Sequence, residues 1–238
     1  MEAPEISPRF LAPRADAPTA SRPSPSRARV WDLPLRVFHW SLVVAVTAAV
    51  VTAKLGGAWM AWHGRAGLAI VALLVFRLVW GVAGGRTARF ASFAPSPSRL
   101  RDYARGRWRG TGHNPLGALS VFAMLGLLAL QAGTGLFGND DIAFTGPLNR
   151  FVDDAFGARL TGWHRWLADG LFVLLGLHLA AIAFHELIKR HRLIKAMWTG
   201  WIDGPPASRT FAEGSRSVLI AALLLAAGVV GMLAWAGR

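Results

Sequence analysis

The fold is decided by residues 160–187, which read LTGWHRWLADGLFVLLGLHLAAIAFHEL. The apolar run at 167–188 is long enough to cross a hydrocarbon core of about 30 Å as a helix. His164 and His178 lie 14 residues apart. At about 100° and 1.5 Å per residue, this spacing falls about 40° short of four turns and rises about 21 Å. Both imidazoles are therefore expected on one side of the helix, at two depths.

The composition is that of a membrane protein. Of the 238 residues, 53% are hydrophobic and 16% are charged, whereas soluble domains carry about 25% charged residues. In lipid, a single short segment satisfies its backbone polar groups only as a helix. The sequence therefore predicts an all-α integral membrane protein with a four-helix transmembrane bundle and a fifth, C-terminal transmembrane helix. The other four apolar runs lie at 35–53, 66–83, 116–137 and 218–236.

The chain divides into three parts by composition. Residues 1–30 are rich in Pro, Ser, Ala and Arg, which predicts a disordered tail. Residues 31–200 hold the bundle, and 201–238 hold a linker and the last helix. The net charge of +13 comes from segments that flank the apolar runs, so membrane lipid is the expected partner and nucleic acid is not. Because the chain has no Cys, any metal must be held by His, carboxylate or Met.

Loop charges predict the orientation in the membrane. Seven arginines lie between the second and third apolar runs, and the segment after the fourth run is also basic. The loop between the third and fourth runs instead carries four aspartates, Asp140, Asp141, Asp153 and Asp154. Since Lys and Arg concentrate on the cytoplasmic side, we expect a cytoplasmic N-terminus in a bacterial inner membrane, with the acidic loop outside as a candidate docking surface.

Four histidines form two expected pairs. His63, at the head of the second helix, should lie level with His164 on the outer side. His39, early in the antiparallel first helix, should lie level with His178 on the inner side. One axial nitrogen on each face of a macrocycle is what bis-imidazole haem ligation requires, whereas zinc or copper sites need three or four ligands at one depth. We therefore expect two haem b groups and one-electron transfer.

Three further residues bear on these sites. Arg77, 14 residues after His63, is a costly charge inside a helix and is expected to pair with a propionate of the inner haem. Arg36, one turn before His39, is equally consistent with the same role and with an interfacial positive charge. His185 lies seven residues after His178, about 20° from the same helix face, so the spacing alone leaves it open as the inner ligand.

The ordered set of motifs resembles the bacterial cytochrome b561 and nickel–iron hydrogenase b-type cytochrome family. The matching stretches lie between about residues 30 and 200: VWDLPLRVFHW, WHGRAGLAIVALLVFRLVWG, GHNPLGALS and the opening stretch. The resemblance implies a four-helix bundle with two b-type haems and carries the ligand roles onto four histidines. Its GLH motif favours His178 over His185. The four implied iron ligands are His39, His63, His164 and His178.

The leading functional hypothesis is a dihaem cytochrome b that relays electrons between a redox partner protein and the quinone pool or another cytochrome. The resemblance implies a hydrogenase-like subunit or a cytochrome c as partner, and quinone as an exchangeable one. An electron-carrier subunit is favoured over a stand-alone enzyme. The alternatives are a quinol or superoxide oxidoreductase, with His113, Gln131 or Arg77 lining a substrate site, and a non-redox membrane subunit. A reduced-minus-oxidised b-type spectrum would exclude the last.

Overall fold

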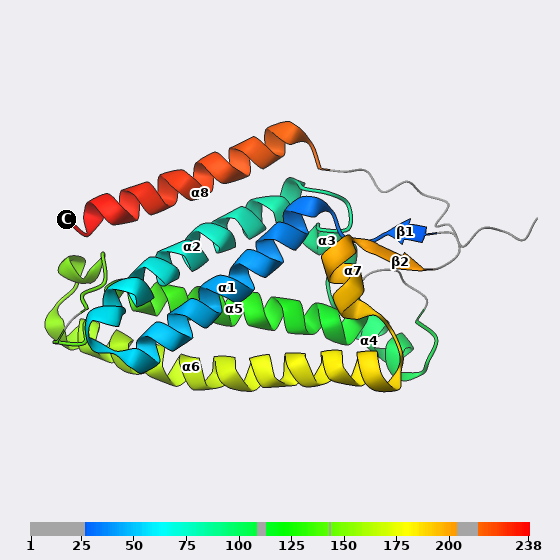
Figure 1. Cartoon of the computed structure of the whole chain (residues 1–238), viewed down its shortest axis with the longest axis horizontal. Coiled ribbons are helices and arrows are strands. Elements are labelled where there is room, and N and C mark those ends of the chain that lie inside the picture. The colour runs from blue at the N-terminus through cyan, green and yellow to red at the C-terminus, as the bar shows by residue number, and fades with distance from the viewer. Residues whose placement is uncertain (1–26, 109–112, 143, 204–213) are drawn as a thin grey trace, which may run out of the picture.

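A computed structural model describes residues 27–108, 113–142, 144–203 and 214–238. Within these residues, five helices are long and apolar enough to cross a membrane, as Figure 1 shows. The predicted all-α membrane architecture is confirmed. The spans are α1 (Leu33–Leu55), α2 (Met60–Ala83) with a preceding 3-10 turn at Gly57–Trp59, α5 (Pro115–Phe137), α6 (Asp154–Ala183) with a π-helical turn at Phe184–Ile188, and α8 (Arg216–Ala236).

Side-chain caps mark where α1, α5 and α6 begin. Asp32 accepts a hydrogen bond from the Leu35 amide (2.8 Å) and starts α1. Asn114 caps α5, and Asp153 caps α6. In each case a side-chain oxygen accepts a hydrogen bond from a backbone N–H group in the first turn that has no partner within the helix. The apolar run predicted the fourth span from 167, but α6 begins 13 residues earlier, because its capped first turns are polar and hydropathy does not detect them.

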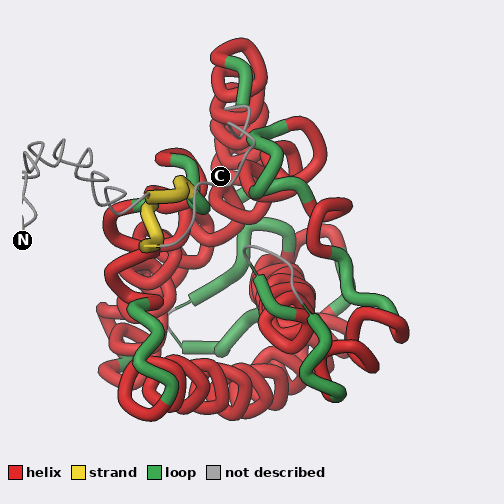
Figure 2. Tube along the Cα trace, turned by 90° about the vertical axis from the view of Figure 1, so that its right-hand side faces the viewer, coloured by secondary structure: helices red, strands yellow, loops and turns green. Residues whose placement is uncertain are grey.

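The main bundle consists of two helix hairpins. Helix α1 packs along α2, and α5 packs along α6, while the two hairpins meet chiefly through α2 and α5. Figure 2, viewed nearly along the bundle, shows α8 standing outside these four helices. Only 6% of the apolar window of α6 is buried within the protein. The surface of α6 is therefore largely left for lipid or for a group between the hairpins.

One end of the bundle, which we call the sheet end, is covered by short elements. These are β1 (Arg27–Arg29), β2 (Trp201–Asp203), α3 (Phe90–Phe93), α4 (Pro97–Ala104) and α7 (Leu193–Thr199). Strand β1 pairs antiparallel with β2. Residues 27–30, which composition placed in the tail, thus belong to the ordered fold at this end. The rest of the expected tail, and linker residues 204–213, lie outside the described residues.

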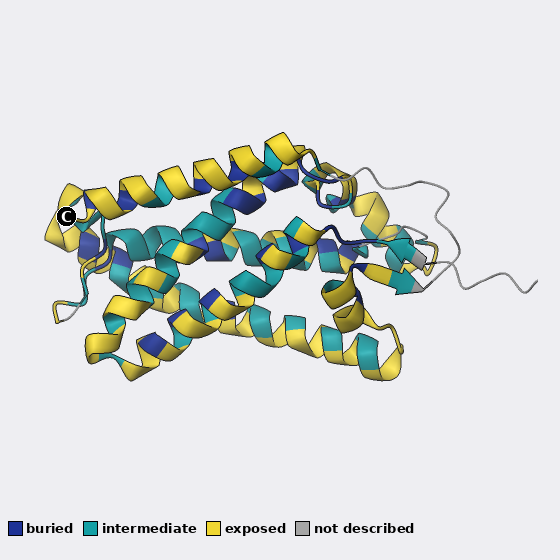
Figure 3. Ribbon diagram, turned by 45° about the horizontal axis from the view of Figure 1, so that its top comes forward, coloured by how far each residue is buried: buried dark blue, intermediate teal, exposed yellow. Residues whose placement is uncertain are grey.

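The main hydrophobic core lies near the sheet end. Trp80 of α2 is only 1% exposed, and its indole nitrogen donates to the Asp32 carboxylate at 3.1 and 3.3 Å. Ala222 and Ala226 of α8 belong to the same cluster, so the fifth helix is anchored on α2. Figure 3 shows that most other outward positions on the long helices are exposed, as expected of helices that face lipid.

Candidate functional site

His63 and His164 come together between the two hairpins. Their ring centroids are 5.9 Å apart and their planes are perpendicular. His63 belongs to α2, and His164 lies well inside α6 because that helix starts early. We call these two residues the first pair. Within the described residues, no group of three or more His, Cys, Asp or Glu side chains could hold a metal ion. The arrangement therefore consists of pairs.

Each imidazole of the first pair is held by a backbone carbonyl of the neighbouring helix. The Nδ1 of His63 is 2.9 Å from the carbonyl oxygen of Ala49 on α1. The Nδ1 of His164 is 2.8 Å from the carbonyl oxygen of Gln131 on α5. A carbonyl oxygen only accepts, so in each case Nδ1–H is the donor. The lone pair then resides on Nε2, which is the tautomer that a metal-ligating histidine needs.

Helix α5 supplies the other contacts of His164. The Gln131 side-chain nitrogen lies 3.1 Å from Nε2, and the Thr134 hydroxyl lies 3.3 Å from Nδ1. Gly135 makes room for the ring, since a Cβ there would lie 2.9 Å from Cε1. The side-chain oxygen of Gln131 is buried and finds no hydrogen-bond partner among the residues that the structure describes. The sequence singled out Gln131 only as a substrate-site lining, and the structure places it directly against His164.

His39 and His178 form the second pair, nearer the sheet end. They are close enough to interact electrostatically, and both are half-buried. Nδ1 of His39 is buried and has no hydrogen-bond partner among the described residues, and the same is true of Nε of Arg36, one turn earlier, and Nε1 of the adjacent Trp40. The second pair therefore differs from the first, because its part of α1 carries three unsatisfied polar atoms, whereas both imidazoles of the first pair are held by backbone carbonyls. Buried polar atoms of this kind indicate a missing polar partner.

The structure separates His185 from the second pair. His185 lies in the π-helical turn after α6, where its Nδ1 is 3.3 Å from Nδ1 of His191. His178, and not His185, is the histidine that interacts with His39. The two residues that the spacing left open therefore have different surroundings.

The two predicted arginines also differ. Arg77 is 2% exposed, and its guanidinium carbon lies 4.3 Å from the ring centroid of Phe90. Its Nη1 has no hydrogen-bond partner among the described residues. Arg36 donates from Nη1 to the carbonyl oxygen of Trp198, at the end of α7. Arg36 is thus partly committed to the sheet end, and its Nε is a second buried donor that lacks a partner in the described part of the chain.

His113 is a partly buried histidine whose surroundings the sequence did not predict. It lies between Trp31 (ring centroids 4.5 Å apart) and Phe93 (4.6 Å), and its buried Nδ1 has no hydrogen-bond partner in the described part of the chain. Burial, and to a smaller extent the nearby Arg77 guanidinium, lowers the pKa of His113 to about 4. The sequence singled out His113 as a candidate lining of a substrate site; in the structure it lies just before α5, which the next residue, Asn114, caps. The aromatic residues on either side come from distant segments.

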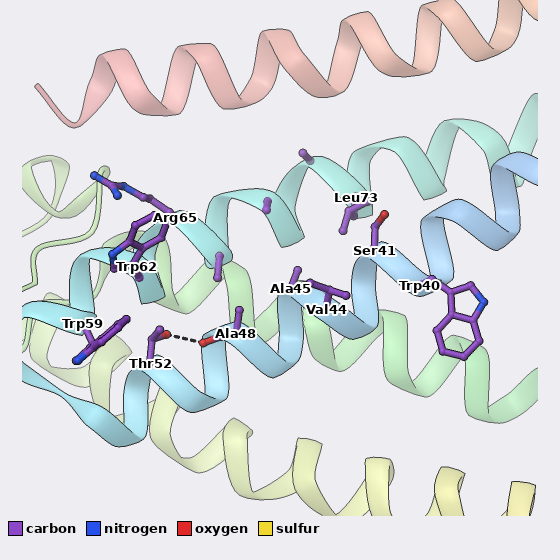
Figure 4. A pocket seen from close by; sticks show the side chains of 13 residues that line it. Trp40, Ser41, Val44, Ala45, Ala48, Thr52, Trp59, Trp62, Arg65 and Leu73 are labelled. Atoms are coloured by element: carbon purple, nitrogen blue, oxygen red, sulfur yellow. Dashed lines mark hydrogen bonds between the residues drawn. The ribbon is translucent and has the colours of Figure 1, made fainter.

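A groove of about 1030 Å³ runs between α1 and α2, and Figure 4 shows it with Trp59, Trp62 and Arg65 toward one end and Trp40 toward the other. None of the four paired histidines lines it. Its walls are mostly alanine and other apolar side chains. The groove is therefore separate from the histidine pairs and offers little polar chemistry.

Comparisons with known proteins identify the family of the chain. The family model described as prokaryotic cytochrome b561 matches residues 30–200. A relative from Azotobacter chroococcum mcd 1, described as "Probable Ni/Fe-hydrogenase B-type cytochrome subunit", is 24% identical over 208 residues, covering 72% of this chain and 87% of that protein. No solved structure matches. Because the family model spans most of the chain, the chain belongs to the prokaryotic cytochrome b561 family, as a multi-pass bacterial membrane protein that binds haem b and transfers electrons.

Proposed function

We propose that this protein is a dihaem cytochrome b in which His63 and His164 hold one haem and His39 and His178 hold the other. The observation that carries the proposal is the first pair, whose ring centroids are 5.9 Å apart with perpendicular planes. The carbonyl contacts at Nδ1 leave the lone pair of each ring on Nε2, the nitrogen proposed to bind iron. Each pair takes one histidine from the α1–α2 hairpin and one from α6, so each haem would lie between the hairpins.

The residues present fit haem b. When bound, each haem would supply a one-electron carrier, and it would be held by His63 with His164 or by His39 with His178. Unsatisfied buried donors at Arg36, Trp40 and Arg77 match the propionate carboxylates that a haem brings, since charge-assisted hydrogen bonds are the strong ones. We propose Arg77 and Arg36 as propionate partners of the haem at the second pair.

The packing of the helices also supports this proposal. The two hairpins meet chiefly through α2 and α5, so α1 and α6 make few direct contacts with each other. Flat apolar macrocycles between the hairpins would bury surface of both helices. His164 and His178 on α6 are separated by a rise of about 21 Å, so the two proposed haems would be held at two depths between the hairpins.

The proposed role is a relay between a redox partner protein and quinone or another cytochrome. The relative's description as a hydrogenase b-type cytochrome subunit makes a hydrogenase-type enzyme the first partner to test. Basic segments after α2 and α6 support a cytoplasmic N-terminus in the inner membrane. The sheet end would then face the cytoplasm, and the first pair would lie toward the outside.

The test is haem stoichiometry in purified variants. The wild type is expected to contain two acid-acetone-extractable haems b per chain, because no Cys is present for covalent attachment. His164→Gly and His178→Gly should each lose one haem, and added imidazole should restore it if the variant is folded. His185→Gln is the matched control on the same helix and should retain both. One haem in the wild type, or two in His164→Gly without imidazole, would contradict the proposal.

A further inference from the structure

The pair formed by His185 and His191 is used neither by the fold nor by the haem proposal. Their Nδ1 atoms are 3.3 Å apart, and their rings are nearly parallel with centroids 5.5 Å apart. His191 is exposed and His185 is half-buried. Two imidazole nitrogens are therefore held side by side at the surface near the sheet end. The first of these histidines, His185, lies seven residues beyond His178.

The backbone between them is folded to bring the rings together. The π-helical turn Phe184–Ile188 ends α6, and Arg190 then adopts φ 54°, a left-handed conformation that side-chain-bearing residues rarely adopt. The His191 amide donates to the His185 carbonyl oxygen at 2.8 Å. The Glu186 carboxylate accepts from the Ile194 amide at 2.7 Å and closes the loop onto α7. Single π-turns inside helices are often associated with functional sites.

The distance between the two nitrogens matches a metal chelate. Zinc binds histidine nitrogens at about 2.0–2.1 Å with tetrahedral geometry, which places two such ligands about 3.3–3.4 Å apart. We propose that His185 and His191 form a surface binding site for a divalent transition-metal ion of the Zn²⁺ or Cu²⁺ class, with water completing the coordination. Imidazole nitrogen suits this class, whereas Mg²⁺ and Ca²⁺ prefer oxygen.

The surroundings set the strength of this site. Lys189 interacts electrostatically with His185, so its charge opposes a bound cation. The site also has only two protein ligands, so it should bind metal more weakly than structural or catalytic zinc centres, which have three or four. The site is therefore one for exchangeable metal. Copper should bind more tightly than zinc, in keeping with the usual order of divalent metals.

The experiment uses the haem-loaded protein, purified without a histidine tag and stripped of metal with a chelator. Zn²⁺ binding is measured by calorimetry, and Cu²⁺ binding by electron paramagnetic resonance of the oxidised protein. We expect one metal ion per chain and nitrogen hyperfine structure from two imidazoles. His185→Gln and His191→Gln should each weaken binding by about tenfold or more, because the second nitrogen binds at high effective concentration. The haem spectra should stay unchanged in both variants.

Lys189→Gln is the matched variant with the opposite expectation, since removing the nearby charge should tighten metal binding severalfold. Metal binding that survives both histidine substitutions would overturn the proposal. So would metal binding that is weakened in only one of the two variants, or copper that is coupled to a single nitrogen. A wild type that binds no Zn²⁺ or Cu²⁺ would overturn it as well. The haem stoichiometry is read separately, so failure here is distinct from failure of the dihaem proposal.

Discussion

The partly buried His113 should make the stability of the protein depend on pH. Its pKa is lowered to about 4 in the folded state by burial and by Arg77, against about 6.5 in the unfolded chain. The unfolded state therefore binds a proton in a pH range where the folded state does not. By linkage, the free energy of unfolding falls as pH decreases from about 6.5 to 4, and above 6.5 this residue has no effect.

The magnitude follows from the difference between the two pKa values. Each of the roughly 2.5 pH units is worth about 1.4 kcal/mol, so the full effect is at most about 3–4 kcal/mol. Between pH 7.5 and pH 5, about 2 kcal/mol should be lost through His113 alone. His113→Leu removes the titrating group while keeping an apolar side chain between Trp31 and Phe93.

The assay is unfolding in mild detergent, followed by circular dichroism, at pH 7.5 and pH 5. Other groups titrate as well, so the informative quantity is the difference between the wild type and His113→Leu. The wild type should lose about 2 kcal/mol more than the variant on acidification. His113→Gln, which is polar but does not titrate, should behave like His113→Leu. Parallel pH dependence in all three proteins would refute the reasoning, because His113 would then be accessible to protons when folded.

Two further predictions concern packing. Asp32→Ala removes the cap of α1 and the acceptor for Trp80, so it should lower the free energy of unfolding by about 2–3 kcal/mol. Thermal unfolding measures this change. An unchanged midpoint would argue against a structural role for the Asp32 carboxylate. Gly135→Ala would place a Cβ 2.9 Å from Cε1 of His164 and should reduce haem content through displacement of that ring. Gly67→Ala, which has nothing within 4 Å of the new Cβ, is its control, and equal haem content in the two variants would contradict the steric argument.

Hydropathy predicted the number of spanning helices because lipid allows few other structures for a long apolar segment. It failed at the start of α6, where the cap at Asp153 and a polar first turn extend the helix to residue 154. The acidic loop shows the same limit. Asp140 accepts from the Ile142 and Phe144 amides, and Asp153 from the Phe156 amide, so two of the four aspartates have structural roles that residue type alone does not reveal.

The histidine pairing could be predicted in part. Helical spacing placed His164 and His178 on one face, and antiparallel order placed their partners at matching depths. What spacing could not provide was the distinction between His178 and His185, because it depends on where α6 ends in a π-helical turn and on the return of His191. The aromatic contacts of His113 were equally out of reach, since Trp31 and Phe93 are brought to it only by tertiary packing.

Each hairpin of the bundle supplies both a histidine and the group that orients it. In the α1–α2 hairpin, the Ala49 carbonyl of α1 holds His63 of α2; in the α5–α6 hairpin, the Gln131 carbonyl of α5 holds His164 of α6. Orientation is therefore fixed within a hairpin, while ligation in the proposed dihaem arrangement joins the two hairpins. Since the hairpins share few direct contacts, a haem bound only by the folded state would contribute to their association by mass action. The same geometry that orients the imidazoles would then make the bundle depend on its cofactor.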